Sequence, residues 1–217
     1  HIQIYLFEND ATGKKIIHAL QEAANRQVTI YLLLDGFGSL SLPLETINKL
    51  KQSGINFRYF SPLFSANSFY LGRRLHQKVV VADAKVALIG GINIADKYHG
   101  TKNEKPWLDY AIQINGKIAA PLQELCKAIY FKEKKIQRKK ILPAFQPQQE
   151  ALIRILQNDW LNRKNEISNA YIKSIRNAKE EITIVGSYFL PGRKLTNALK
   201  KASQNKVRIR LILSGVS

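Results

Sequence analysis

The sequence predicts a mixed α/β fold, a β-sheet flanked by helices, and two features of the chain predict it. Short apolar segments that suit strands alternate with segments whose apolar residues recur every three or four positions, as in amphipathic helices. A unit of one helix followed by one strand also occurs twice along the chain. With 217 residues and a hydrophobic content of 45%, the chain can bury a sizeable core.

Each element of the first part of the chain is assigned from its own pattern. Ile16, Leu20 and Ala23 lie on one face of a helix, and Leu32–Leu34 is a continuous apolar run typical of a buried strand. Helices are predicted at 14–25, 43–52 and 119–132. Strands are predicted at 2–7, 28–35, 55–60, 75–82, 86–89 and 110–114. Helices between strands favour a mixed sheet covered on both faces.

The repeated unit suggests two lobes. Residues 13–36 align without gaps with residues 192–215, and ten positions are identical. We therefore predict a first lobe at 1–140, a linker with two prolines at 141–165, and the start of a second lobe at 166–217. At the same offset, a second copy of the motif described below is expected at about residue 255, beyond the end of the sequence.

Composition narrows the partners. The chain has 34 Lys and Arg against 16 Asp and Glu, a net charge of +18, which indicates nucleic acid, an anionic membrane surface or a phosphate-bearing substrate. The single cysteine, Cys126, lies in a segment whose apolar residues recur at helical spacing, and we expect it to be a buried structural thiol. No apolar run is long enough to span a bilayer. The chain begins at His1 and has no Met, so we expect that its natural N-terminus is missing. Any signal or membrane anchor upstream would then lie outside this sequence.

The most specific pattern is H-x-K-x-x-x-x-D-x-x-x-x-x-x-G-G-x-N, formed by His76, Lys78, Asp83, Gly90, Gly91 and Asn93. Alternation in a strand from Leu75 would put His76 and Lys78 on one side of a pocket. A histidine can attack phosphorus, a lysine can neutralise phosphate, and Asn93 can donate an amide N–H to a phosphate oxygen. The two glycines permit a tight turn and a close approach of the backbone to the substrate.

A catalytic histidine also needs a carboxylate that fixes its tautomer and raises its basicity. Asp83 and Asp109 are the candidates. Since no cluster of His, Cys, Asp and Glu has the spacing of a metal site, we expect chemistry without a metal or cofactor.

The motif resembles the HKD motif of the phospholipase D superfamily, and nearly the whole chain resembles bacterial cardiolipin synthases of that superfamily. The segments that carry the resemblance are DATG at 10–13, LLLDGFGS at 32–39, SGINFRYFSP at 53–62, GRRLHQK at 72–78, GGINIADKYHG at 90–100, PWLD at 106–109 and SYFLPG at 187–192. The resemblance implies a two-lobed fold in which each half donates one HKD motif to a shared active site. It also implies transfer of a phosphatidyl group between phosphatidylglycerol molecules through a phosphohistidine, at the bacterial cell membrane.

By the same resemblance, Asp109 corresponds to the carboxylate that orients one catalytic histidine. The resemblance does not indicate which half supplies that histidine. Arg73 and Arg74 are expected to contact lipid phosphate, because planar guanidinium groups suit phosphate oxygens. The second histidine must come from sequence outside this chain or from a partner chain, so we expect the isolated chain to be inactive.

Two other readings stay open. Single-HKD phosphodiesterases of the superfamily act on nucleic acid as homodimers, and a basic chain would suit that substrate. The repeat argues against this reading, because a single-motif enzyme would not carry the beginning of a second lobe. The other reading is a relative that binds anionic lipid without turnover, which requires the absent half to lack its own H-x-K.

Overall fold

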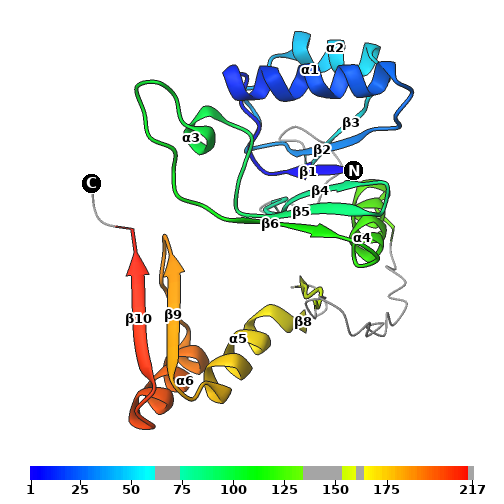
Figure 1. The fold of residues 1–217 in the computed structure, drawn as a ribbon. Coiled ribbons are helices and arrows are strands. Elements are labelled where there is room, and N and C mark those ends of the chain that lie inside the picture. Colours follow the sequence, from blue (N-terminus) through cyan, green and yellow to red (C-terminus); the bar gives the residue numbers. More distant parts are fainter. Residues whose placement is uncertain (62–73, 134–152, 160–163, 215–217) are drawn as a thin grey trace. The chain divides into compact units, whose positions relative to one another are not determined.

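The structure is a computed structural model that describes residues 1–61, 74–133, 153–159 and 164–214. The chain forms two compact units, residues 1–153 and 154–217 (Figure 1). Arg73 and much of the predicted linker at 141–165 lie outside the described residues.

The first unit is built on a six-stranded sheet with the order β3-β2-β1-β4-β5-β6. Its strands are β1 (Ile2–Ile4), β2 (Tyr31–Asp35), β3 (Asn56–Phe60), β4 (Lys78–Ala82), β5 (Val86–Gly90) and β6 (Ala111–Asn115). The first three strands are parallel, β4 is antiparallel to β1, and β5 and β6 continue the antiparallel half. This mixed sheet flanked by helices confirms the predicted fold class.

The helices of the first unit are α1 (Ala11–Asn25), α2 (Leu44–Gln52), the short α3 (Asp96–His99) and α4 (Ala119–Phe131). In Figure 1, α1 and α2 lie over one face of the sheet and α4 lies on the opposite face. Helices α1 and α2 connect parallel neighbours, as a crossover connection requires. Asp10 begins α1 as its N-cap, with its Oδ1 accepting a hydrogen bond from the Gly13 backbone N–H at 2.8 Å.

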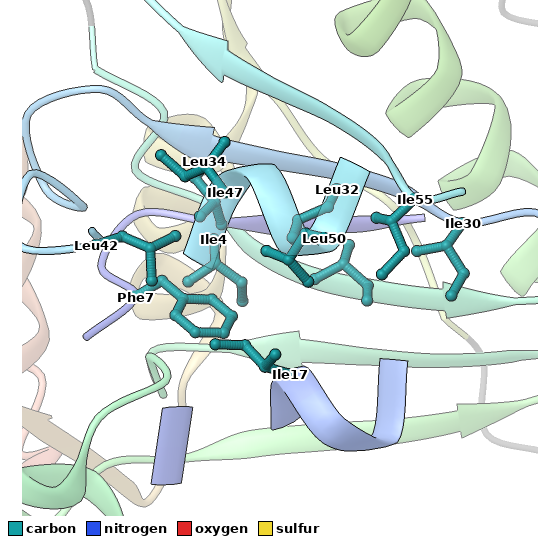
Figure 2. Close-up of a cluster of buried hydrophobic side chains, with 11 residues drawn as sticks. Ile4, Phe7, Ile17, Ile30, Leu32, Leu34, Leu42, Ile47, Leu50 and Ile55 are labelled. Atoms are coloured by element: carbon teal, nitrogen blue, oxygen red, sulfur yellow. The ribbon is translucent and has the colours of Figure 1, made fainter. Parts of the chain in front are cut away.

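The main core lies between the parallel half of the sheet and helices α1 and α2 (Figure 2). It is formed by aliphatic side chains and one phenylalanine, namely Ile2, Ile4, Phe7, Ile17, Ile30, Leu32, Leu34, Leu42, Ile47, Leu50 and Ile55. Leu33 points the other way and packs with Leu75 and Tyr130 of α4. The continuous apolar run of β2 therefore fills both faces of the sheet, as expected for a buried parallel strand.

Cys126 of α4 is fully buried, which confirms the predicted environment of this thiol. Burial raises the pKa of the Cys126 thiol to about 12, so the group stays protonated and unreactive. The Gln3 side chain of β1 donates to the Cys126 carbonyl oxygen at 2.7 Å and so joins α4 to the sheet.

The second unit contains a short hairpin, a helix and a βαβ unit. Its elements are β7 (Asn158–Asp159), β8 (Lys164–Asn165), α5 (Glu166–Asn177), β9 (Glu181–Gly186), α6 (Arg193–Gln204) and β10 (Arg208–Leu213). Strands β9 and β10 are parallel, and Ile175, Ala198, Ala202 and Val207 form the core between them and the two helices. The order β9-α6-β10 repeats the order β1-α1-β2, with α6 and β10 formed by the second copy of the repeated sequence.

Strands β1 to β4 are shorter than the predicted ranges 2–7, 28–35, 55–60 and 75–82. For β1 and β4, hydrogen bonds to side chains explain the difference. Strand β1 ends at Ile4 because the Leu6 and Phe7 N–H groups donate to the Asn93 and Ser39 side chains instead of to a neighbouring strand. Strand β4 begins at Lys78 and not at Leu75, since the Leu75 N–H donates to the Asp35 carboxylate. His76 therefore lies just before the strand.

Candidate active site

Strand direction gathers the motif residues at one edge of the first unit's sheet. The carboxyl ends of β1, β2 and β5 and the amino ends of β4 and β6 all meet there. Lys78 is paired with Gly90, and Gly90 is paired with Ala111. We call this edge, with the residues immediately beyond these strand ends, the site edge. Residues distant in the sequence come together there because β1, β2 and β5 run toward this edge, whereas β4 and β6 run away from it.

His76 and Lys78 lie together at the site edge, although His76 is outside the strand. The Lys78 Nζ donates to the His76 carbonyl oxygen at 2.8 Å. The Tyr5 ring, just beyond β1, lies against both: its centroid is 5.1 Å from that of the imidazole and 5.3 Å from the Lys78 Nζ. The shared contact with Tyr5 places the imidazole and the ammonium group on one side of the site edge.

The electrostatic environment favours a neutral imidazole. Partial burial lowers the pKa of His76 below the ordinary 6.5, the Lys78 charge lowers it further, and Asp35 partly offsets both. A lowered pKa leaves most of the imidazole unprotonated at pH 7, with a lone pair available for attack. His76 is thus suited to be a nucleophile or a base and less suited to be an acid.

Lys78 is buried, with 8% of its surface exposed. Burial lowers the pKa of Lys78, and the negative charge of Asp109 acts in the opposite direction. A buried ammonium group is costly unless anions or hydrogen-bond acceptors compensate it. The site edge therefore offers a positive charge that an anionic phosphate would stabilise.

Gly90 and Gly91 bring the backbone of β5 and its continuation close to the Asp109 segment. A Cβ at Gly90 would lie 2.2 Å from the Tyr110 carbonyl oxygen. A Cβ at Gly91 would lie 2.1 Å from Oδ1 of Asp109. The Asp109 carboxylate lies over the Gly91 backbone and also accepts a hydrogen bond from the Tyr110 N–H at 2.7 Å. The two glycines thus make room for this segment.

Asn93 is buried, with 7% of its surface exposed, and its amide holds the chain beyond β5 against β1. Its Oδ1 accepts from the Leu6 N–H at 3.0 Å, and its Nδ2 donates to the Tyr98 hydroxyl at 2.7 Å. An amide nitrogen carries two hydrogens, so the bond to Tyr98 does not use both. Asn93 belongs to the site edge and has a clear structural function there.

Asp83 lies at the other end of β4, in the turn that connects it to β5. Asp83 and Ala84 have φ values of 50° and 54°, and the Lys85 N–H donates to the Ala82 carbonyl oxygen at 3.0 Å. The connection of three residues, 83–85, thus begins with two residues in the left-handed region, which Asp tolerates. The structure does not bring Asp83 to His76, because the whole length of β4 separates them.

One of the two predicted arginines, Arg74, lies near the site edge. Arg74 is exposed, and its guanidinium lies over the Phe37 ring at 4.8 Å from the centroid. Phe37 belongs to the turn after β2, so this contact puts Arg74 beside the site edge. Arg73 lies outside the described residues.

Tyr5 and Asp35 are residues at the site edge that the motif analysis missed. Asp35 is fully buried at the end of β2 and raises the pKa of His76. Its signal in the sequence was an acidic residue directly after an apolar run and before a glycine. Tyr5 had no such signal, since a tyrosine at the end of a strand is ordinary.

Within the described part of the chain, no group of three or more His, Cys, Asp and Glu side chains could hold a metal ion. Among the same residues, no helix is long and apolar enough to cross a bilayer.

Comparison with protein families gives one match that spans most of the chain. The model described as "Cardiolipin synthase, PLD-like domain" matches residues 1–126 and 171–217, which include both copies of the repeat. Cardiolipin synthase B of Shigella flexneri is 32% identical over 99% of this chain and 53% of its own length. Cardiolipin synthase A of Pseudomonas fluorescens is 30% identical over 98% of this chain and 45% of its own length. The chain thus spans about half the length of these curated relatives.

Among solved structures, the phosphatidylserine synthase of Haemophilus influenzae Rd KW20 matches with a TM-score of 0.64. That match covers 98% of this chain and 55% of the other, at 17% sequence identity. At this identity the likeness concerns the fold alone.

Proposed function

Because the chain belongs to the family of phospholipase D-like domains of cardiolipin synthases, we propose that its full-length protein is a phosphatidyltransferase of the cardiolipin synthase type. In this proposal, a phosphatidyl group moves from one phosphatidylglycerol to the hydroxyl of another. The single observation that best supports it is the gathering of His76, Lys78 and Asp109 at one edge of the sheet. Family membership supplies the reaction class, and the chemistry of the edge is compatible with it.

In the first step we propose that a nitrogen of His76 attacks the phosphorus of phosphatidylglycerol. A P–N bond forms, the P–O bond to the terminal glycerol breaks, and the leaving oxygen takes a proton from a general acid. The lowered pKa of His76 supports this role, because the attacking nitrogen must be unprotonated. The Lys78 ammonium would neutralise charge on the phosphoryl oxygens, and Arg74 would bind the phosphate from the exposed side.

In the second step, a hydroxyl of the acceptor phosphatidylglycerol attacks the phosphohistidine. A P–O bond forms, the P–N bond breaks, and the acceptor's proton returns to the group that served as the acid. The products are cardiolipin and glycerol, and no proton is gained or lost overall. We propose that the acid and base is a second histidine, supplied by sequence outside this chain or by a partner chain.

The partners follow from the same proposal. The substrate is an anionic lipid, and the net charge of +18 would favour a negatively charged membrane surface. We propose that the protein acts at the bacterial cell membrane. Asp83 serves the fold as a turn residue in this proposal, and Gly90 and Gly91 serve the site by admitting the Asp109 segment.

The reaction is tested with the full-length protein, vesicles of phosphatidylglycerol and an excess of chelator, with products followed by mass spectrometry. Cardiolipin and glycerol in equal amounts are the expected products. Single-stranded and duplex DNA are incubated in parallel. Shortened DNA together with unchanged lipid would replace the proposal with a nuclease, and binding of vesicles without any product would indicate the non-catalytic relative.

The role of His76 is tested by His76→Ala, with His18→Ala as the matched control. His18 is exposed on α1, with its Nδ1 3.7 Å from Oε2 of Glu22, so its loss should leave turnover unchanged. Loss of a nucleophile should reduce turnover by on the order of 1,000-fold or more. Substantial residual turnover in His76→Ala, with no phosphohistidine trapped in the unmodified protein, would remove His76 from the mechanism.

A further inference from the structure

His76 raises a question of position, because it lies outside the strand that would otherwise fix it. Strand β4 begins at Lys78, and residues 74–77 have no strand partner. A nucleophile must be held to within a fraction of an ångström for efficient transfer. The backbone just before His76 must therefore be fixed by something other than the sheet.

The contact that fixes this backbone is made by Asp35. Its Oδ2 accepts a hydrogen bond from the Leu75 N–H at 2.7 Å, one residue before His76. Its Oδ1 accepts from the Phe37 and Gly38 N–H groups, both at 3.0 Å. One carboxylate thus joins the turn after β2 to the entrance of β4.

The burial of Asp35 makes this arrangement unusual. The residue has no exposed surface, and a buried carboxylate is costly unless hydrogen bonds satisfy its oxygens. The three backbone N–H groups provide that compensation. A buried polar network whose groups are all hydrogen-bonded makes the segments that it joins rigid.

The second copy of the repeat shows that the strand end itself does not require a carboxylate. The position that matches Asp35 is Ser214, directly after β10. The Ser214 hydroxyl donates to the Ser187 carbonyl oxygen at 3.0 Å. The helix and strand of this unit thus form with a hydroxyl in place of the acid, so the carboxylate of Asp35 serves a need of the first unit.

We propose that Asp35 is a positioning residue that fixes His76 at the site edge by binding the amide of the preceding residue. This inference rests on the proposed function for what His76 does. The same turn also carries Phe37, on which Arg74 stacks. Asp35 therefore helps to position both neighbours of Leu75. These are His76, the proposed nucleophile, and Arg74, a proposed phosphate ligand.

Electrostatics give Asp35 a second, measurable effect. Its negative charge raises the pKa of His76, against the lowering by burial and by Lys78. Removing the charge should lower the pKa of His76 further. This effect is separate from the position of the backbone, so the two can be read independently.

The test uses Asp35→Asn in the full-length protein. An amide nitrogen cannot accept a hydrogen bond, so at least one of the three N–H groups loses its acceptor. We expect kcat for phosphatidylglycerol to fall about 10- to 100-fold, with KM changed less than about two-fold. We also expect the His76 pKa, measured by NMR titration of its ring protons, to fall.

Two further variants separate position from stability. Ile55→Val removes a buried methyl group just before β3, at the end of the sheet opposite the site edge. It should lower Tm while leaving kcat and the His76 pKa unchanged. Asp35→Ser copies Ser214, the matching residue of the second copy, and should fold with the same loss of kcat as Asp35→Asn.

The outcomes distinguish this inference from the proposed function. If the unmodified protein does not turn over phosphatidylglycerol, the proposed function fails, while the NMR titration still tests the link between Asp35 and His76. A folded Asp35→Asn with unchanged kcat and unchanged His76 pKa would overturn the inference. Failure of both Asp35 variants to fold would also overturn it, since Asp35 would then be required by the fold and not by the position of His76.

Discussion

Replacing Gly91 by alanine tests whether the position of the Asp109 carboxylate matters for the reaction. A Cβ at Gly91 would lie 2.1 Å from Oδ1 and 2.5 Å from Oδ2 of Asp109. Ordinary contact begins at 3.4 Å, so Oδ1 must retreat by about 1.3 Å, the difference between the two distances. Asp109 is exposed and can make this movement by rotating its side chain.

The fold should tolerate the change, and the chemistry should not. The φ angle of Gly91 is outside the left-handed region, so alanine fits the backbone there. The carboxylate would move relative to the Lys78 charge that it faces. A misplacement of about 1 Å can cost about 100-fold in rate, and we expect a fall in kcat of that order for Gly91→Ala.

The assay is the initial rate of cardiolipin formation by the full-length protein at several lipid concentrations, with Tm measured alongside. The control is Gly186→Ala in β9, where the nearest atom to an added Cβ is the Tyr188 carbonyl oxygen at 3.6 Å. This variant should retain both kcat and Tm. A wild-type kcat in Gly91→Ala would refute the reasoning, because the carboxylate would then have moved without consequence.

Three further predictions concern charge and backbone strain. Lys78→Gln should raise the pKa of His76 toward 6.5, because the lysine charge lowers that pKa. The measurement is an NMR titration of the His76 ring, and an unchanged pKa would contradict the prediction. Ala84→Gly should stabilise the protein by roughly 1 kcal/mol, because glycine adopts the left-handed φ of 54° without the strain that alanine has there. Urea unfolding measures this, and an unchanged free energy of unfolding would contradict the prediction. Asp96→Asn should lower Tm at pH 7. Hydrogen bonds from Thr12 lower the pKa of Asp96 below 3.8, so the stability they give is present above that pH and is lost as pH falls through the folded pKa. The difference in Tm between wild type and Asp96→Asn should therefore become smaller in acid. A difference that does not change with pH would show that the charge of Asp96 does not stabilise the fold.

The elements of the fold followed from the sequence where one physical signal dominated. The helical spacing of Ile16 and Leu20 predicted α1, and the run Leu32–Leu34 predicted β2, because apolar periodicity reflects burial directly. Strand ends were less predictable. The end of β1 depends on bonds from the side chains of Asn93 and Ser39, which come from distant parts of the chain.

The same distinction applies to the candidate site. The spacing from His76 to Asn93 marked the residues within one continuous segment, and the structure gathers His76, Lys78 and Asn93 at one edge. Asp35 reaches that edge only because β1 lies between β2 and β4, and local sequence does not specify strand order. Asp83 was included for its place in the motif, whereas its location depends on the hairpin that β4 forms with β5.

The two carboxylates at the site edge can be separated by the groups on which they act. The charges that shift the pKa of His76 are those of Lys78 and Asp35, and the charge that shifts the pKa of Lys78 is that of Asp109. Asp35 is buried at the end of β2, while Asp109 is exposed at the edge. An exposed carboxylate is accessible to a histidine from another part of the protein, and a buried one is not. We therefore predict that Asp109→Asn lowers the pKa of His76 less than Asp35→Asn does, as measured by NMR titration of both variants. A larger decrease in Asp109→Asn would assign Asp109 to His76 and leave a second histidine without this partner.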